Sequence, residues 1–162
     1  MAQRLLRSPA ERIFAGSSPA LRFFKMTVYS KKLTINTKER ISFIRITDEV
    51  RRAVKESGVQ DGIVLINPMH ITASVFVNDN EGGLLKDFKI WLEKLAPKEF
   101  KYNHHKTGED NGFSHLWRTI MGRETVVSVQ NFELELGRWE EIFYGEFDGQ
   151  RNKKILIKVL GE

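Results

Sequence analysis

The chain has 162 residues, of which 41% are hydrophobic and 29% are charged, and it contains no cysteine. This is the composition of an ordinary soluble globular protein, and it excludes disulfides, thiolate metal sites and thiol nucleophiles. No apolar run approaches the ~18 residues that cross a bilayer, so no membrane partner is expected.

The formal charge of +5 is concentrated at the N-terminus. Residues 1–25 carry five Lys/Arg against Glu11 alone, whereas the rest of the chain is nearly neutral. No basic face is therefore evident in the body, and no nucleic-acid partner is expected. We interpret residues 1–25 as a poorly ordered extension, either an organellar transit peptide or the product of a start codon placed before a true initiator at Met26. Residues 26–162 are expected to form one domain, cytoplasmic, or organellar if the extension is a transit peptide.

From Met26 onward, the hydrophobic pattern predicts strands on both sides of a central group of helices. Alternation predicts a strand over 28–35, and helical spacing predicts a helix that starts at Thr47 or Asp48 and is closed by Gly58. Strands are expected within 62–67 and 72–79, followed by helices within 82–97 and 115–122. Three more strands are expected within 124–129, 138–147 and 153–161. The predicted fold class is α+β, with a large mixed β-sheet or sandwich and a few flanking helices.

All four histidines fall between residues 70 and 115. His70 lies between two predicted strands, His104 and His105 lie in a polar loop, and His115 starts a short helix. Three neutral imidazoles that converge on one point are suited to a divalent metal ion, and a protein without cysteine must hold a transition metal with histidine and carboxylate. The spacing alone leaves open that these are ordinary loop histidines. His105, adjacent to His104, is expected to be a spectator.

Other polar side chains have both a functional and a structural interpretation. Asn78 ends a strand, where it either contacts a ligand or belongs to the turn "NDNEGG". Asp110 can orient a histidine ring or cap the following helix. Alternation directs only one of Glu140 and Glu141 inward. Arg151 suits a phosphate or belongs to a solvated turn.

Five stretches resemble the YjbQ-type family, often named secondary thiamine-phosphate synthase. They are "HITASVFVNDN", "YNHHKTGEDNGFSHL", "MGRETVVSV", "ELGRWEEIFYGEFDG" and "ILIKVLGE", and the resemblance runs from Met26 to Glu162. The motif histidines of the family fall on His70, His104 and His115. Its remaining motif positions fall on Asn78 to Asn80, Asp110, Gly137 to Glu140 and Arg151.

The resemblance implies an α+β homotrimer in which His70, His104 and His115 hold a divalent metal ion, zinc, with magnesium as an alternative beside a diphosphate substrate. It implies a transferase that joins a pyrimidine diphosphate to a thiazole phosphate and yields thiamine phosphate. Asp110 and Glu140 would then be catalytic, and Asn78, Trp139 and Arg151 would bind the phosphorylated substrate, with Trp139 stacking on a planar ring or packing in the core. The alternative is a non-catalytic trimer that binds a phosphorylated metabolite or a metal.

The chain departs from the family pattern at four positions. Ile71 removes a hydroxyl beside the first histidine, and His105 replaces an Asn or Asp. Arg138 and Glu140 replace a neutral Thr and Gln with charges. Whether these changes alter the activity that the resemblance implies is left open.

Overall fold

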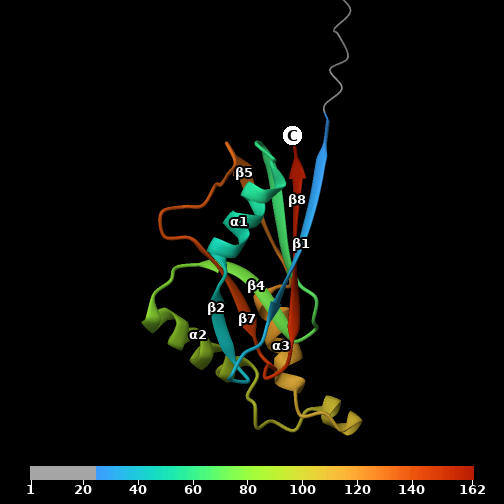
Figure 1. Cartoon of the computed structure of the whole chain (residues 1–162). Coiled ribbons are helices and arrows are strands. Elements are labelled where there is room, and N and C mark those ends of the chain that lie inside the picture. Colours follow the sequence, from blue (N-terminus) through green and yellow to red (C-terminus); the bar gives the residue numbers. More distant parts are fainter. Residues whose placement is uncertain (1–24) are drawn as a thin grey trace, which may run out of the picture.

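The computed structural model describes residues 25–162, so all of the predicted extension except Lys25 lies outside the described residues. Figure 1 shows the order and arrangement of the elements. The strands are β1 (Thr27–Ile35), β2 (Ser42–Arg45), β3 (Gly62–Pro68), β4 (Ala73–Asn78), β5 (Thr125–Gln130), β6 (Glu133–Leu134), β7 (Glu141–Glu146) and β8 (Lys153–Gly161). The helices are α1 (Thr47–Ser57), α2 (Gly82–Leu95), α3 (Gly112–Met121) and the 3-10 helix η2 (Asn103–Thr107).

The strands form two sheets. One has the order β1-β8-β3-β5-β6 and the other has the order β2-β7-β4. The predicted α+β class, with packed sheets and flanking helices, is confirmed. In detail, every pairing between the described strands is antiparallel, whereas the sequence predicted a mixed sheet.

Alternation along the strands gives the five-stranded sheet one buried face. Ile157 and Val159 of β8 are fully buried, and their register partners Ile66 and Val64 of β3 are buried beside them. The side chains between them point to the other face, because successive side chains of a strand alternate. We call that other face the open sheet face; its apolar side chains are Val28, Ile63, Leu65, Val126, Leu156 and Leu160.

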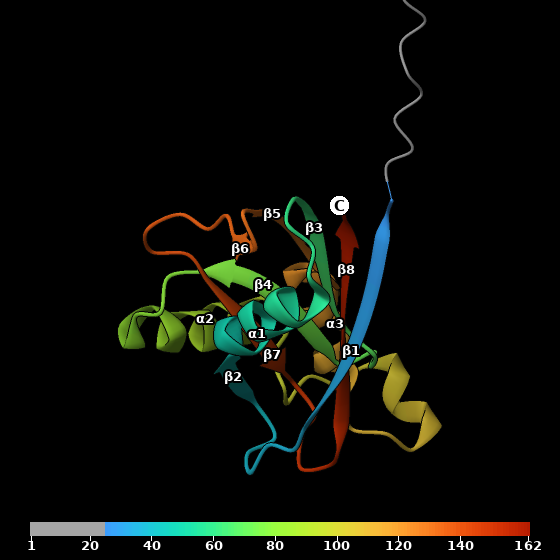
Figure 2. The same cartoon turned by 45° about the horizontal axis from the view of Figure 1, so that its top comes forward.

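Helix α1 packs against the buried face of this sheet and extends its core (Figure 2). The helix ends as predicted at Gly58, whose φ of 67° is a left-handed value that favours glycine. The predicted side-chain cap at its start is absent. Instead the Thr47 hydroxyl accepts a hydrogen bond from the Ile142 amide at 2.8 Å, which ties the start of α1 to β7.

A second apolar cluster joins α2, α3 and the end of β7. Trp117 is buried, and its indole N–H donates to the Ala96 carbonyl at 2.9 Å. On the same helix, the Ser114 hydroxyl donates to the Phe147 carbonyl at 2.7 Å. These two bonds fix α3 against its neighbours, so that the polar residues at its N-terminal end lie beside the connection between β7 and β8.

Helix α2 differs most from its sequence pattern. Its sequence places Leu84, Leu85, Phe88, Trp91, Leu92 and Leu95 on one helical stripe, but Leu92 alone is fully buried in this helix. Trp91 and Leu95 of the same stripe are 44% and 52% exposed. None of the helices in residues 25–162 combines the length and the apolarity needed to cross a bilayer.

Candidate functional site

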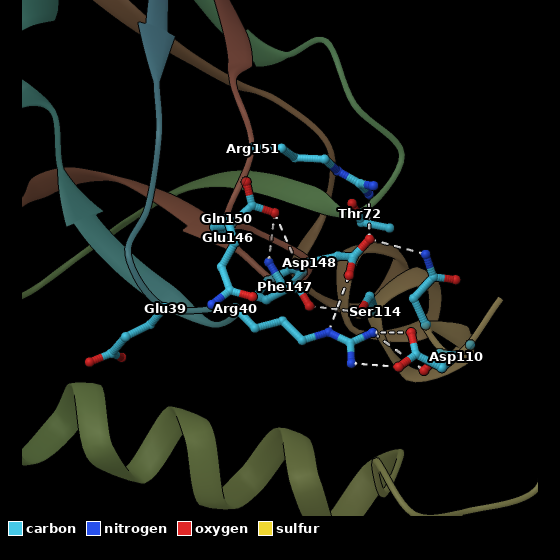
Figure 3. A network of polar contacts seen from close by, with 12 residues as sticks. Glu39, Arg40, Thr72, Asp110, Ser114, Glu146, Phe147, Asp148, Gln150 and Arg151 are labelled. Carbon is cyan, nitrogen blue, oxygen red and sulfur yellow. Dashed lines mark hydrogen bonds and ion pairs between the residues drawn. The ribbon is translucent and has the colours of Figure 1, made fainter.

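Asp148, in the connection between β7 and β8, is the centre of a polar network (Figure 3). Its carboxylate accepts hydrogen bonds from Arg40 Nε at 3.2 Å, from Arg151 at 2.5 Å and from the Asn111 amide at 3.1 Å. The Asp148 side chain is 13% exposed. Three segments that are distant in the sequence are therefore held together by one carboxylate.

A buried ion pair supports this network from behind. Glu146 and Lys153 are 0% and 1% exposed, and Lys153 Nζ lies 3.3 Å from Glu146 Oε1. Glu146 also accepts from the Tyr144 hydroxyl at 2.6 Å and from the backbone amide of Asp148 at 3.0 Å. Burial and the contact with Glu146 raise the pKa of Tyr144, which keeps that hydroxyl protonated as a donor. The pair thus anchors the backbone that carries Asp148.

Two of the predicted histidines are brought together. His104, from η2, and His115, from α3, have ring centroids 4.6 Å apart. Burial lowers the pKa of His115, and the charge of His104 lowers it further. His115 is therefore mainly neutral near pH 7, and its ring carries one N–H donor and one bare nitrogen acceptor.

Asn111 connects His104 to the carboxylate of Asp148. The amide nitrogen of Asn111 must face Asp148, because a carboxylate only accepts hydrogen bonds. Its amide oxygen then faces His104 Nε2 at 3.2 Å, and an amide oxygen requires a donor. The Nε2 atom of His104 therefore carries the proton, and in the neutral ring Nδ1 is the acceptor.

Asp110 lies beside this pair but is engaged by Arg40. The two terminal nitrogens of the guanidinium donate to its two carboxylate oxygens at 2.9 and 2.5 Å. These hydrogen bonds hold the pKa of Asp110 below its ordinary value. His105 accepts from the Gly112 amide at 3.4 Å and so takes part in starting α3; its spectator role stays a prediction.

His70 lies in a separate cavity of about 410 Å³, which also contains Arg118, Arg123 and Leu156. We call it the anion cavity. Burial lowers the pKa of His70, and the charge of Lys153 lowers it further. Arg118 lies one helical turn after His115, and its charge contributes to the lowered pKa of that histidine, so the cavity and the histidine pair are neighbours. The Nε–H of Arg118 is buried without a hydrogen-bond acceptor among the described residues.

The remaining predicted residues lie elsewhere. Asn78 is the last residue of β4, whereas His70 lies shortly before the first residue of that strand. The two ends of this six-residue strand are about 16 Å apart. The Asn78 side chain accepts from the Asp79 amide at 2.8 Å, which is a turn contact. Glu140 accepts from the Gly137 amide at 2.6 Å, and Trp139 is 65% exposed. Trp139 and Glu140 belong to the connection that precedes β7, and Figures 1 and 2 show this connection on the other side of the molecule from η2 and α3.

The site also contains residues that the sequence did not predict, namely Arg40, Arg118, Arg123 and Asp148. Arg118 had a local signal, because it follows His115 by three residues on a predicted helix and so shares its face. Arg40 and Asp148 had none, since they are 108 residues apart and meet only through the fold.

Solved structures with this architecture exist. A YbjQ-like protein of unknown function from Sulfolobus solfataricus matches with a TM-score of 0.81 and 33% identity, over 85% of this chain and 100% of that chain. A YjbQ/UPF0047 protein from Clostridium acetobutylicum matches with a TM-score of 0.75 and 32% identity, over 80% of this chain and 98% of that chain.

Sequence comparison agrees. The family model described as UPF0047 protein YjbQ-like matches residues 31–162. A UPF0047 protein of Methanothermobacter thermautotrophicus is 36% identical over 137 residues, 85% of this chain and 95% of the relative. UPF0047 protein YugU of Bacillus subtilis is 34% identical over 132 residues, 81% of this chain and 98% of the relative. The chain belongs to the YjbQ/UPF0047 family, and the predicted resemblance is confirmed.

The predicted activity is corrected by the same findings. The relatives carry family names without an activity, and the Sulfolobus structure is described as of unknown function. Across residues 25–162, no group of three or more His, Cys, Asp or Glu side chains is placed to hold a metal ion. His70 lies in the anion cavity, apart from the His104–His115 pair. The prediction of a metal-dependent thiamine-phosphate synthase is therefore wrong, and whether zinc or magnesium binds in another manner stays a prediction.

Proposed function

We propose that the protein binds a small phosphate-bearing ligand in the anion cavity. The observation that carries this proposal is the buried Nε–H of Arg118, which lacks an acceptor among the described residues. Leaving a buried donor unpaired costs about 1–3 kcal/mol, which a ligand oxygen would recover once the Arg118 side chain turns its Nε–H into the cavity. Arg118 and Arg123 together present two guanidinium forks, whose geometry matches the oxygens of a phosphate.

The neighbouring groups suit the rest of such a ligand. His70, with its lowered pKa, is mainly neutral near pH 7 and offers one donor and one acceptor. Arg151 is 60% exposed, and Asp148 directs its guanidinium at the edge of the network. The predicted substrate-binding role of Arg151 therefore remains a proposal, whereas the positions of Asn78 and Trp139 favour no contact with the same ligand.

The test is titration of the full chain with inorganic phosphate and with pyrophosphate in a calorimeter. Arg118→Gln should weaken binding about 10- to 100-fold, because a hydrogen bond to a charged group is worth about 1.5–3 kcal/mol. Arg138→Gln is the matched control, since the Arg138 guanidinium lies over the Trp139 ring, on the other side of the molecule. Equal affinities for the two variants, or no saturable binding by the unaltered chain, would refute the proposal.

The histidine pair favours a second candidate, proton transfer to or from the bound ligand. His104 has a fixed acceptor nitrogen, and His115 is neutral beside it, which are the properties of general acid–base groups near pH 7. The assay is release of inorganic phosphate from phosphate monoesters. His104→Gln should abolish release while phosphate binding stays unchanged, and a lack of release from every monoester would leave binding as the function.

Assembly as a homotrimer remains a proposal, for which the open sheet face is the candidate interface. Val126 is 55% exposed there, and Leu156 belongs both to this face and to the anion cavity. A second subunit on this face would therefore border the ligand. Val126→Lys should lower the mass measured by sedimentation equilibrium, whereas Ile90→Lys, at an equally exposed position on α2, should not. A monomeric unaltered chain would exclude the trimer.

A cytoplasmic location is likewise a proposal, supported by the complete lack of cysteine, which fits a reducing compartment. Imaging of a C-terminal fluorescent fusion tests it. An organellar signal that disappears when residues 1–25 are removed would favour the transit-peptide alternative instead.

A further inference from the structure

A second cavity, which we call the α2 cavity, lies between α2, the β1–β2 connection and α3. Its volume is about 510 Å³, within the range of small-molecule sites. It shares no lining residue with the anion cavity. Its lining residues are Glu39, Ile41, Lys89, Ile90, Glu93, Lys94, Lys98 and Trp117.

The body of the α2 cavity is apolar. Trp117 is 1% exposed and Ile41 is half-buried, so both belong to the second core cluster. Ile90, at the mouth, is 54% exposed although it is a large aliphatic side chain. An apolar group of a ligand would cover Ile90 and contact the indole, which removes apolar surface from water.

One end of the cavity has an acceptor without a donor. Glu93 Oε1 accepts from the Lys98 backbone amide at 3.0 Å. Glu93 Oε2 is buried and forms no hydrogen bond among the described residues, although the exposed Lys98 ammonium lies 3.4 Å away. Figure 3 shows Glu39 pointing toward α2, on the opposite side of its strand connection from the Arg40 guanidinium. A second carboxylate thus joins the rim near Glu93.

Charges of both signs therefore surround an apolar interior. The carboxylates Glu39 and Glu93 suit an ammonium group, and the exposed ammonium groups of Lys89 and Lys94 suit a carboxylate. An amine without an acid would be repelled by the lysines, and an acid without an amine would leave Glu93 Oε2 without a hydrogen bond, with the Lys98 ammonium beside it. A ligand that complements both the carboxylates and the lysines carries a positive and a negative charge close together on an apolar body.

We propose that the α2 cavity binds a free apolar α-amino acid as its zwitterion. The Glu93 side chain turns its Oε2 to accept from the α-ammonium group, the α-carboxylate lies among the rim lysines, and the side chain packs between Trp117, Ile41 and Ile90. This site is independent of the phosphate-binding proposal.

The test uses the full chain and three probes, namely L-phenylalanine, phenethylamine and 3-phenylpropionate, titrated by calorimetry and by the amide and indole shifts in NMR. L-phenylalanine should bind at least tenfold more tightly than either single-charge probe and should shift the Trp117 indole signal. Equal affinity of L-phenylalanine and 3-phenylpropionate, or no saturable binding by any probe, would overturn the proposal.

Two variants locate the site. Glu93→Gln retains an acceptor for the Lys98 amide but removes the carboxylate, and it should weaken L-phenylalanine binding at least tenfold, whereas the exposed Glu99→Gln should leave it unchanged. If Glu93→Gln does not fold, Ile90→Glu provides a second test, because it blocks the mouth from an exposed position. Either variant should bind inorganic phosphate as the unaltered chain does. Unchanged L-phenylalanine binding in the folded variants would refute the site.

Discussion

Replacing Glu146 with Gln tests the buried ion pair on which the polar network rests. In the native chain the two carboxylate oxygens accept from Tyr144, from the backbone amides of Phe147 and Asp148, and from Lys153. A glutamine keeps the shape and one acceptor oxygen, and the Tyr144 hydroxyl can turn to accept from the new amide. The change that remains is the loss of the negative charge beside Lys153.

The expected magnitude follows from the burial of Lys153. Its ammonium is 1% exposed and would keep the Thr72 hydroxyl, at 3.1 Å, and the neutral oxygen of the glutamine, but no negative charge. An uncompensated buried charge of this kind destabilises a protein by about 3–5 kcal/mol, out of a typical total of about 5–15 kcal/mol. The free energy of unfolding of Glu146→Gln should fall by that amount, measured by urea unfolding followed through tryptophan fluorescence.

The double variant Glu146→Gln/Lys153→Met separates the charge from packing. Methionine removes the orphaned ammonium and keeps an unbranched side chain, so the double variant should be more stable than Glu146→Gln alone. A loss below about 1 kcal/mol in the single variant, or a double variant that is less stable still, would refute this account of the pair.

Three further predictions concern stability. Phe132 has a φ of 64°, a left-handed value that costs a residue with a side chain about 1–2 kcal/mol. Glycine adopts this value without that strain but loses about 0.5–1 kcal/mol more backbone entropy on folding. The net effect of Phe132→Gly should therefore be a higher urea midpoint. A lower midpoint would show that the aromatic ring contributes more than the strain costs. Ser114→Ala should lower the free energy of unfolding by about 1 kcal/mol, because the Phe147 carbonyl loses its buried donor. An unchanged free energy of unfolding would contradict this. The pKa values of His70 and His115 are lowered below about 6.5 in the fold, so the unfolded chain binds protons first and stability should fall as the pH drops through about 6.5. The variant with both histidines replaced by Gln should show a flatter pH profile of the urea midpoint.

Much of the secondary structure was predictable because its signals are local. Apolar alternation located β1 and β4, and Gly58 marked the end of α1. Strand β2 was missed because its four residues run directly into α1, where helical spacing dominated the pattern. In α2 the apolar stripe predicted the helix correctly but not its burial, because periodicity does not reveal how much of a face its neighbours cover.

The sequence by itself determined the fold class, the family and the strongly basic N-terminal segment. It placed His104 and His115 within eleven residues and on adjoining elements, and the fold keeps them together. It could not place His70, which lies in a neighbouring cavity and not within that pair, or Asn78 and Glu140, which lie on the far side of the molecule.

Only the tertiary structure decided which charged groups meet. Asp148 gathers Arg40, Asn111 and Arg151 because the β7–β8 connection, the β1–β2 connection and the start of α3 converge at one point. That convergence depends on strand register and on the packing of Phe147 against α3. Both are relations between segments that are distant in the sequence. Hydrophobic periodicity indicates only which side of one segment is apolar, so it does not predict which other segments pack there.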